Sequence, residues 1–158
     1  MSYQTFYSLH IYSYVIWLLA FAGSLLLASK VREETDVHRK RQYIRYERLI
    51  TNIGAHLAAL GILISGGGMV SLEEGPRWGW FDFQEHTWLA VKQLFFVLIL
   101  VCIGFSIKRS RALKREIRNF DQVMNDRISQ KWSSAYRMSL LVYMLVLMNT
   151  FLGFVKPF

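Results

Sequence analysis

Four long apolar stretches dominate the 158-residue chain, and they cover residues 6–29, 49–70, 88–107 and 138–155. An α-helix rises about 1.5 Å per residue, so about 20 apolar residues cross a hydrocarbon core about 30 Å thick. Each stretch is close to that length, and the polar sequence between them is too short for a separate soluble domain. The sequence therefore predicts an all-α protein, an integral membrane four-helix bundle that forms one domain over residues 1–158.

Positive charge is concentrated beside these spans and predicts their orientation. Of the 19 Lys and Arg residues, 16 lie in residues 30–48 and 108–137, which follow the first and third spans. Basic loops of membrane proteins stay in the cytoplasm, so we expect a multi-pass protein of a bacterial-type inner membrane with both termini outside. The net charge of +8 sits beside apolar spans, which argues against nucleic acid as a partner. Anionic lipids of the inner leaflet are the expected partners.

Both basic segments are expected to be partly helical. Residues 31–48 carry alternating charges and either extend the first span or lead into the second. Residues 112–128 place apolar residues among basic ones at helical spacing, which predicts a basic amphipathic helix on the inner membrane surface. Glu47 and Arg48, at the inner edge of the second span, are interpreted as a surface ion pair. The outer loop, residues 71–86, is rich in Trp and Phe, and interfacial anchoring is favoured over ligand binding there.

Small residues mark the second span, and a lone cysteine lies in the third. The small residues, which include Gly54, Gly61 and the run 66–68, allow close approach of another helix or of a flat ligand. Three consecutive glycines weaken a helix, so local unwinding is expected at residues 66–68. Cys102 is the one cysteine of the sequence, which excludes an intrachain disulfide and favours a buried core residue.

Polar residues inside membrane spans are costly and are candidates for function. Counting along each span places His10, Lys92 and Asn149 in one layer near the outer face, with Trp17 nearby. His56 lies on the inner side, roughly 15 Å deeper than His10. The two axial nitrogens of one haem are only about 4 Å apart, so these histidines are not expected to share an iron. Each candidate also has a non-functional interpretation. His10 could form a hydrogen bond to a neighbouring carbonyl, Lys92 could extend its ammonium to the outer interface, and His56 could form a helix–helix hydrogen bond.

Four short strings resemble a known family. They are Leu9-His10-Ile11 with Trp17, Tyr46-Glu47-Arg48-Leu49, Trp88-Leu89-Ala90-Val91-Lys92 and the terminal Val155-Lys156-Pro157-Phe158. In order and spacing they resemble the HemJ-type protoporphyrinogen oxidases, and more loosely the wider superfamily with CopD-like membrane domains. The resemblance implies a membrane protein of porphyrin biosynthesis that binds haem b and oxidises protoporphyrinogen IX to protoporphyrin IX.

The resemblance also implies roles for individual residues. His10 matches the family's functional histidine and is expected to bind the haem iron. Lys92 matches its functional lysine, and is expected to pair with a porphyrin propionate or to assist proton removal during catalysis. Asn149 and Trp17, which lie in the same layer, complete the expected cofactor site. His56 is a secondary candidate for metal binding.

Three departures from the family pattern keep a second hypothesis open. Leu27-Ala28-Ser29-Lys30 replaces a Tyr-His, Gly104-Phe105-Ser106 replaces Gly-Tyr-His, and Tyr136-Arg137-Met138-Ser139 replaces Asn-Glu-x-Pro. These changes favour a non-catalytic accessory subunit of a larger redox, photosynthetic or respiratory membrane complex, and a homo-oligomer is also considered. A small-molecule or copper transporter has less support; the six Met residues are scattered and form no thioether cluster of the kind that Cu(I) favours.

Overall fold

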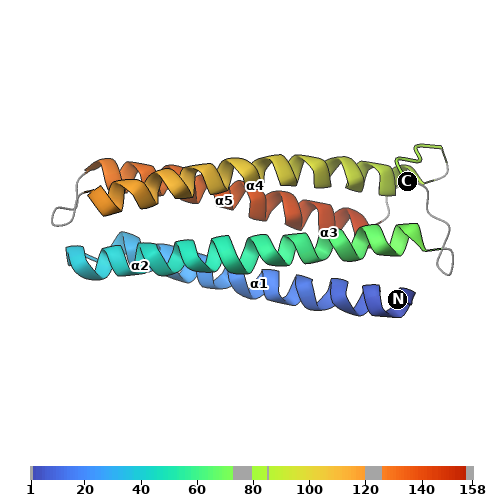
Figure 1. Ribbon diagram of the computed structural model, residues 1–158, viewed down its shortest axis with the longest axis horizontal. Coiled ribbons are helices and arrows are strands. Elements are labelled where there is room, and N and C mark those ends of the chain that lie inside the picture. The colour runs from blue at the N-terminus through green and yellow to red at the C-terminus, as the bar shows by residue number, and fades with distance from the viewer. Residues whose placement is uncertain (1, 73–79, 85, 120–125, 156–158) are drawn as a thin grey trace.

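The computed structural model describes residues 2–72, 80–84, 86–119 and 126–155 (Figure 1). Its elements, in chain order, are α1 (Tyr3–Glu33), α2 (Val37–Leu49), the π-helical segment η1 (Ile50–Ala55), α3 (His56–Ser71), α4 (Thr87–Asn119) and α5 (Asp126–Val155). Because α2, η1 and α3 follow one another without a break, they make one long helix. The described residues therefore form four long helices side by side, and the all-α prediction is confirmed.

Four helices within the described ranges are long and apolar enough to cross a membrane, as a multi-pass membrane protein requires. They are Tyr3–Glu33, Val37–Ser71, Thr87–Arg118 and Arg127–Gly153; the first three each contain a predicted span, and the fourth covers the predicted span 138–155 as far as Gly153. All four are longer than predicted, because the charged segments continue the helices. The 33 residues of α4 extend about 50 Å, well beyond a hydrocarbon core about 30 Å thick.

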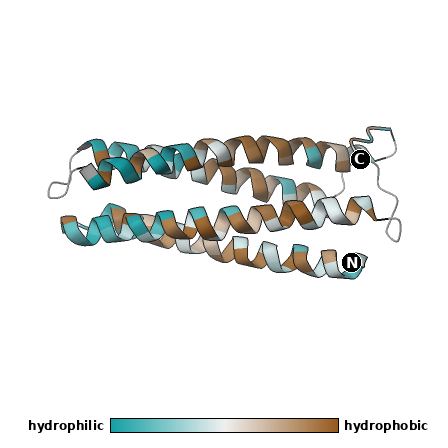
Figure 2. Ribbon diagram, viewed as in Figure 1, coloured by the Kyte–Doolittle hydropathy of each residue, from teal (hydrophilic) through white to brown (hydrophobic). Residues whose placement is uncertain are grey.

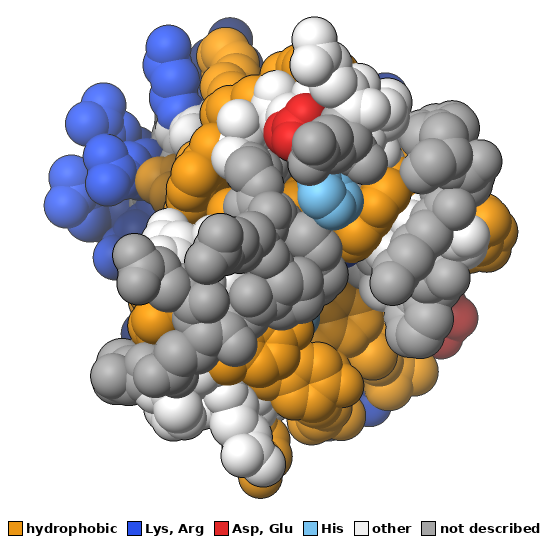
Figure 3. All heavy atoms as spheres, turned by 90° about the vertical axis from the view of Figure 1, so that its right-hand side faces the viewer, with side chains coloured by type: hydrophobic (Ala, Val, Ile, Leu, Met, Phe, Trp, Pro, Cys, Tyr) orange, Lys and Arg blue, Asp and Glu red, His pale blue; other side chains and the backbone are white. Residues whose placement is uncertain are grey.

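The two ends of the bundle differ in character. Hydrophilic residues gather at one end, which holds the C-terminal parts of α1 and α4, all of α2, and the N-terminal part of α5 (Figure 2). We call this the basic end. The opposite end holds the start of α1 and the end of α5, and we call it the terminal end. Seen from the terminal end, the described side chains are mostly hydrophobic or uncharged, and the visible Lys and Arg side chains lie mostly at one edge (Figure 3).

A short turn joins α1 to α2 at the basic end. Asp36 is the N-cap residue of α2, and its carboxylate accepts a hydrogen bond from the backbone N–H of Arg39 at 3.0 Å. This bond lowers the pKa of the Asp36 carboxyl below its ordinary value, since it favours the charged form. The segment 31–48 thus both extends the first span and leads into the second, as the sequence suggested.

The separate surface helix expected over residues 112–128 is not formed within the described residues. Residues 112–119 continue α4, and residues 126–128 begin α5, while residues 120–125 lie outside the described part. Leu113 and Ile128 are buried in a core cluster with Val31, Ile44 and Trp132. Within the described residues, Leu113 and Ile128 of this segment therefore pack against the other helices.

The four long helices pack as two hairpins. One hairpin pairs α1 with the continuous helix α2–η1–α3, and the other pairs α4 with α5; the extensive close approaches between described helix backbones fall within these pairs. Between the hairpins, large aromatic side chains make the contact. The rings of Trp17 and Phe21 in α1 lie 5.4 Å and 4.7 Å from the ring of Tyr143 in α5. Cys102 is buried in the same central cluster, as expected.

The glycines of the second span are used for packing against α1. A Cβ atom on Gly68 would lie 2.5 Å from the Phe6 ring, and one on Gly61 would collide with the Ser13 hydroxyl. Helix packing therefore fills this face, and a flat ligand has no room there. The unwinding expected at residues 66–68 is absent, since α3 continues to Ser71; the irregular segment is η1, nearer the basic end.

Candidate functional site

Polar side chains gather at two levels inside the bundle. The terminal-end group contains His10, Tyr14, Ser65, Lys92, Asn149 and Thr150. The basic-end group contains Ser24, Glu47, Arg48, Thr51, Ser106, Ser110, Trp132, Ser139 and Tyr143. Each group contains residues from both hairpins.

His10 of α1 is held by a hydrogen bond to α3. Its Nδ1 lies 3.0 Å from Ser65 Oγ, and the Ser65 hydroxyl donates to the Gly61 carbonyl oxygen at 2.6 Å. The donor in the bond between His10 and Ser65 depends on the imidazole tautomer, and in the tautomer with a proton on Nδ1, Ser65 accepts from His10 while it donates to Gly61. In that tautomer Nε2 is the ring nitrogen that carries a free lone pair, which is the atom a metal would bind. The ring lies over Gly66, where a Cβ would lie 3.7 Å from its Cε1, an ordinary van der Waals contact.

Lys92 reaches the same neighbourhood from α4. Its Nζ lies 5.9 Å from the centroid of the Trp88 ring, a cation–π distance. A Cβ on Gly153 of α5 would lie 2.5 Å from this Nζ, so the missing side chain at Gly153 makes room for the ammonium. The charge of Lys92 acts on the imidazole of His10. The side chain leans toward the terminal end, in the direction that snorkelling requires, yet it stays half-buried.

Asn149 and Trp17 each carry a buried polar atom that lacks a hydrogen-bond partner among the described residues. These atoms are Oδ1 of Asn149 and Nε1 of Trp17, and the Trp17 side chain is fully buried. Thr150, next to Asn149, accepts a hydrogen bond from the hydroxyl of Tyr14. This bond joins α1 to α5 and so connects the two hairpins. The position of Tyr14 one helical turn after His10, on the same face of α1, is the signal that sequence reasoning missed.

His56 lies apart from His10, in the first turn of α3. Its side chain is 5 % exposed, and neither ring nitrogen has a hydrogen-bond partner among the described residues. Ser65, which bonds His10, is nine residues further along α3, which corresponds to about 14 Å. The two histidines therefore occupy different levels of the bundle, and within the described ranges no cluster of three or more His, Cys, Asp or Glu could hold a metal ion.

Glu47 and Arg48 form a buried ion pair, and the surface pair inferred from the sequence is wrong. Glu47 is fully buried and Arg48 is 7 % exposed. Arg48 Nη2 lies 2.5 Å from Glu47 Oε1, and Arg48 Nε lies 2.6 Å from Glu47 Oε2. The pair is buried because all four helices continue past this level and cover it.

Side chains from all four long helices satisfy this ion pair. Glu47 accepts from Ser24 at 2.9 Å, from Thr51 at 3.0 Å and from the Trp132 indole N–H at 3.3 Å. Arg48 Nη1 donates to Ser110 at 3.3 Å and to Ser139 at 3.2 Å, and Ser139 lies 3.1 Å from Ser106. A buried ion pair is tolerated when further hydrogen bonds satisfy it, as they do here. In the sequence, the Ser and Thr residues within the apolar spans are the feature that indicates a buried polar group, but they do not reveal that Glu47 is its centre.

The two groups differ in what they can do chemically. The donors and acceptors of the basic-end group bond one another, which suits a structural role. The terminal-end group presents an imidazole nitrogen, an ammonium and an unpaired amide oxygen, which suits a bound cofactor or ligand. The chain matches no protein-family model, no curated protein and no solved structure.

Proposed function

We propose that this chain is a membrane protein that binds haem b through His10 and acts in the oxidation of protoporphyrinogen IX, as the HemJ-type enzymes do. The observation that carries this proposal is the hydrogen bond from His10 Nδ1 to Ser65 Oγ, which leaves Nε2 for the iron. Imidazole is a common axial ligand of haem iron, and its second nitrogen is usually held in this way. Lys92, whose charge acts on the same ring, supplies a cation for a propionate group.

The proposed orientation places the basic end in the cytoplasm of a bacterial-type inner membrane. It is supported by the four apolar helices and by the gathering of hydrophilic residues at one end (Figure 2). In this orientation the terminal-end group lies near the outer face. Half-buried Lys92 and the unpaired Asn149 oxygen would then lie inside the bilayer, where such groups mark functional sites.

In this proposal His10 is the residue of this chain that would hold the haem iron. His56 is about 14 Å along α3 from the level of His10, which is too far for the same iron. The glycine face of α3 is not available to a macrocycle, because Phe6 and Ser13 fill it. His10 and Lys92 belong to different hairpins, and a propionate could pair with Lys92 and accept from the Asn149 amide. Haem supplies the one-electron chemistry, while these residues bind and orient it.

An absorption spectrum of the protein purified in mild detergent tests the proposal. The wild-type protein should show a Soret band, and His10→Ala should lose it. His38→Ala is the matched control, because His38 is an exposed histidine of α2 at the basic end. Circular dichroism should show the same helix content in all three proteins. Absence of the band from the wild type, or its survival in His10→Ala, would overturn the assignment.

A non-catalytic accessory subunit is the second candidate, and one observation favours it. Ser106 and Ser139 stand where the family carries polar motifs, and here they bond each other and Arg48. These positions therefore support the basic-end group and contribute nothing to a reaction site. Size-exclusion chromatography with light scattering separates the candidates, since a stable species of one or two chains argues against an obligate subunit.

A further inference from the structure

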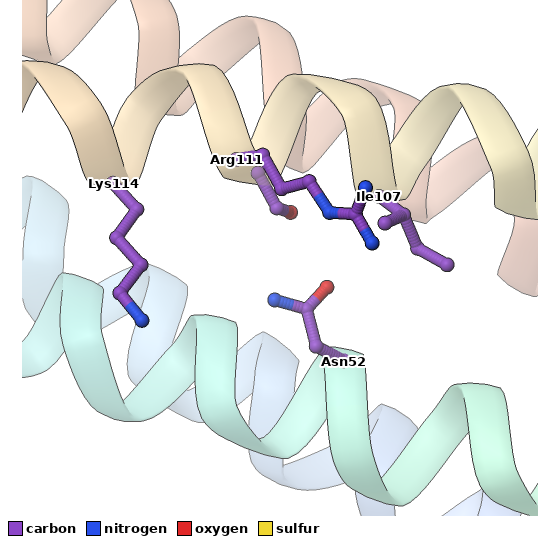
Figure 4. A pocket seen from close by; sticks show the side chains of 5 residues that line it. Asn52, Ile107, Arg111 and Lys114 are labelled. Atoms are coloured by element: carbon purple, nitrogen blue, oxygen red, sulfur yellow. The ribbon is translucent and has the colours of Figure 1, made fainter.

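A pocket of about 310 Å³ opens beside the basic-end group, between the two hairpins (Figure 4). Its lining residues are Asn52 of η1 and Ile107, Ser110, Arg111 and Lys114 of α4. In Figure 4 the Lys114 side chain extends from α4 toward the facing helix, the Arg111 guanidinium lies between the two helices, and Asn52 extends toward α4 from the other side. The pocket thus lies between helices that are distant in sequence.

The lining of this pocket suits an anion. Arg111 and Lys114 are cationic, and neither makes an ion pair with a described residue. Arg48 stands behind the wall and donates to Ser110 Oγ at 3.3 Å, which uses a lone pair and allows the Ser110 hydroxyl hydrogen to point into the pocket. Glu47 does not oppose this charge, because Arg48 already pairs with it.

Asn52 adds an independent indication that a ligand belongs here. Its Oδ1 atom is buried and has no hydrogen-bond partner among the described residues. An unsatisfied buried acceptor is costly, and a hydroxyl or ammonium group of a ligand would satisfy it. The ligand should therefore combine a negative charge with a hydrogen-bond donor.

We propose that the pocket binds the phosphate and the polar head of an anionic phospholipid, with a glycerol hydroxyl donating to Asn52. Ile107 ends the apolar part of α4 and Lys108 begins its charged part, so the pocket lies at the level where headgroups meet hydrocarbon. Its volume equals roughly ten water molecules, which leaves room for a phosphoglycerol group. Basic pockets between membrane helices are known to bind such headgroups. This inference rests on membrane insertion and is independent of haem.

Native mass spectrometry of the detergent-purified full chain with added phosphatidylglycerol tests the proposal. Wild-type protein should retain phosphatidylglycerol in preference to phosphatidylcholine. The double variant Arg111→Gln/Lys114→Gln should bind it about thirtyfold more weakly, since each cation near an anionic headgroup strengthens binding about fivefold. Asn52→Leu should lose the preference for phosphatidylglycerol over phosphatidic acid, which lacks the glycerol hydroxyls.

The matched control removes the same charge from exposed positions of α4 outside the pocket. Lys108→Gln/Arg115→Gln should bind the lipid as the wild type does. Equal loss in both double variants would reduce the effect to overall charge and would overturn the site. Full displacement of the lipid by inorganic phosphate would also overturn it, in favour of a free anion. Release of the protein from membranes by alkaline carbonate would contradict membrane insertion, a result distinct from failure of the pocket or of haem binding.

Discussion

Glu47 and Arg48 are neighbours in sequence, and their side chains turn back on each other inside the bundle, with Arg48 Nη2 2.5 Å from Glu47 Oε1. Five donor atoms converge on the two oxygens of Glu47 from described residues on α1, the continuous second helix and α5. Arg48 extends the connection to α4 through Ser110. The pair therefore holds the two hairpins in register at the basic end.

Removing one member of this pair should destabilise the bundle severely. Glu47→Ala leaves a buried guanidinium without its partner, which costs about 3–5 kcal/mol. Glu116→Ala is the matched control, since the pair between Glu116 and Lys131 is partly exposed and contributes at most about 1 kcal/mol. The measurement is the free energy of unfolding in detergent. A Glu47→Ala protein as stable as Glu116→Ala would contradict the structural role of the pair.

Gly68 should not tolerate a side chain. A Cβ on Gly68 would lie 2.5 Å from the Phe6 ring, and such overpacking typically costs about 1–3 kcal/mol. Gly104→Ala is the control, because a Cβ at Gly104 meets no atom within 4 Å. Thermal unfolding should show a lower midpoint for Gly68→Ala, an unchanged or higher midpoint for Gly104→Ala, and partial recovery in Gly68→Ala/Phe6→Leu. Equal midpoints for the two alanine variants would show that the α1–α3 contact is looser than described.

Lys92 should tune the proposed haem without ligating it. In Lys92→Met the Soret band should persist, and the midpoint potential should fall, because loss of a nearby positive charge favours the ferric state. Lys92→Arg should keep the wild-type potential, which separates charge from packing. Spectroelectrochemical titration of the three proteins measures these potentials. An unchanged potential in Lys92→Met would place the ammonium away from the haem.

The Asp36 cap should weaken only in strong acid. Its folded-state pKa lies below the ordinary value of 3.8, so its contribution is complete above that value and is lost as the pH falls through the folded pKa. The backbone amide of Arg39 receives the cap, and its NMR shift should titrate with a midpoint below 3.8. In Asp36→Asn this titration should disappear. A midpoint at or above the ordinary value would contradict the hydrogen bond.

The sequence was sufficient for the all-α fold class and for the number of long apolar helices, because uninterrupted apolar stretches of this length have few other solutions. It was insufficient for the helix lengths. The alternating charges predict segments that are only partly helical, whereas Val31, Ile44, Leu113 and Ile128 continue the core beyond the apolar part of the bundle. Hydropathy averaged over a window cannot detect so few apolar residues on one face of a charged helix.

The candidate site was predictable only at the level of depth. Counting residues places His10 and Lys92 in one layer, and the structure brings the Lys92 charge to act on His10. Counting residues could not predict the hydrogen bond between Ser65 and His10 or the space that Gly153 leaves for Lys92. Both depend on how the helices are rotated about their axes. Burial of Glu47 was missed for the same reason: Trp132, which donates to it, is 85 residues away in sequence.

The haem content per chain of His10 and His56 variants tests the central claim most directly. The pyridine haemochrome assay on the wild type, His10→Ala and His56→Ala would compare the histidine held by Ser65 with the buried histidine that has no partner among the described residues. Our account predicts equimolar haem b in the wild type and in His56→Ala, and none in His10→Ala. Haem retained by His10→Ala and lost by His56→Ala would contradict it and would move the cofactor to the other level of the bundle.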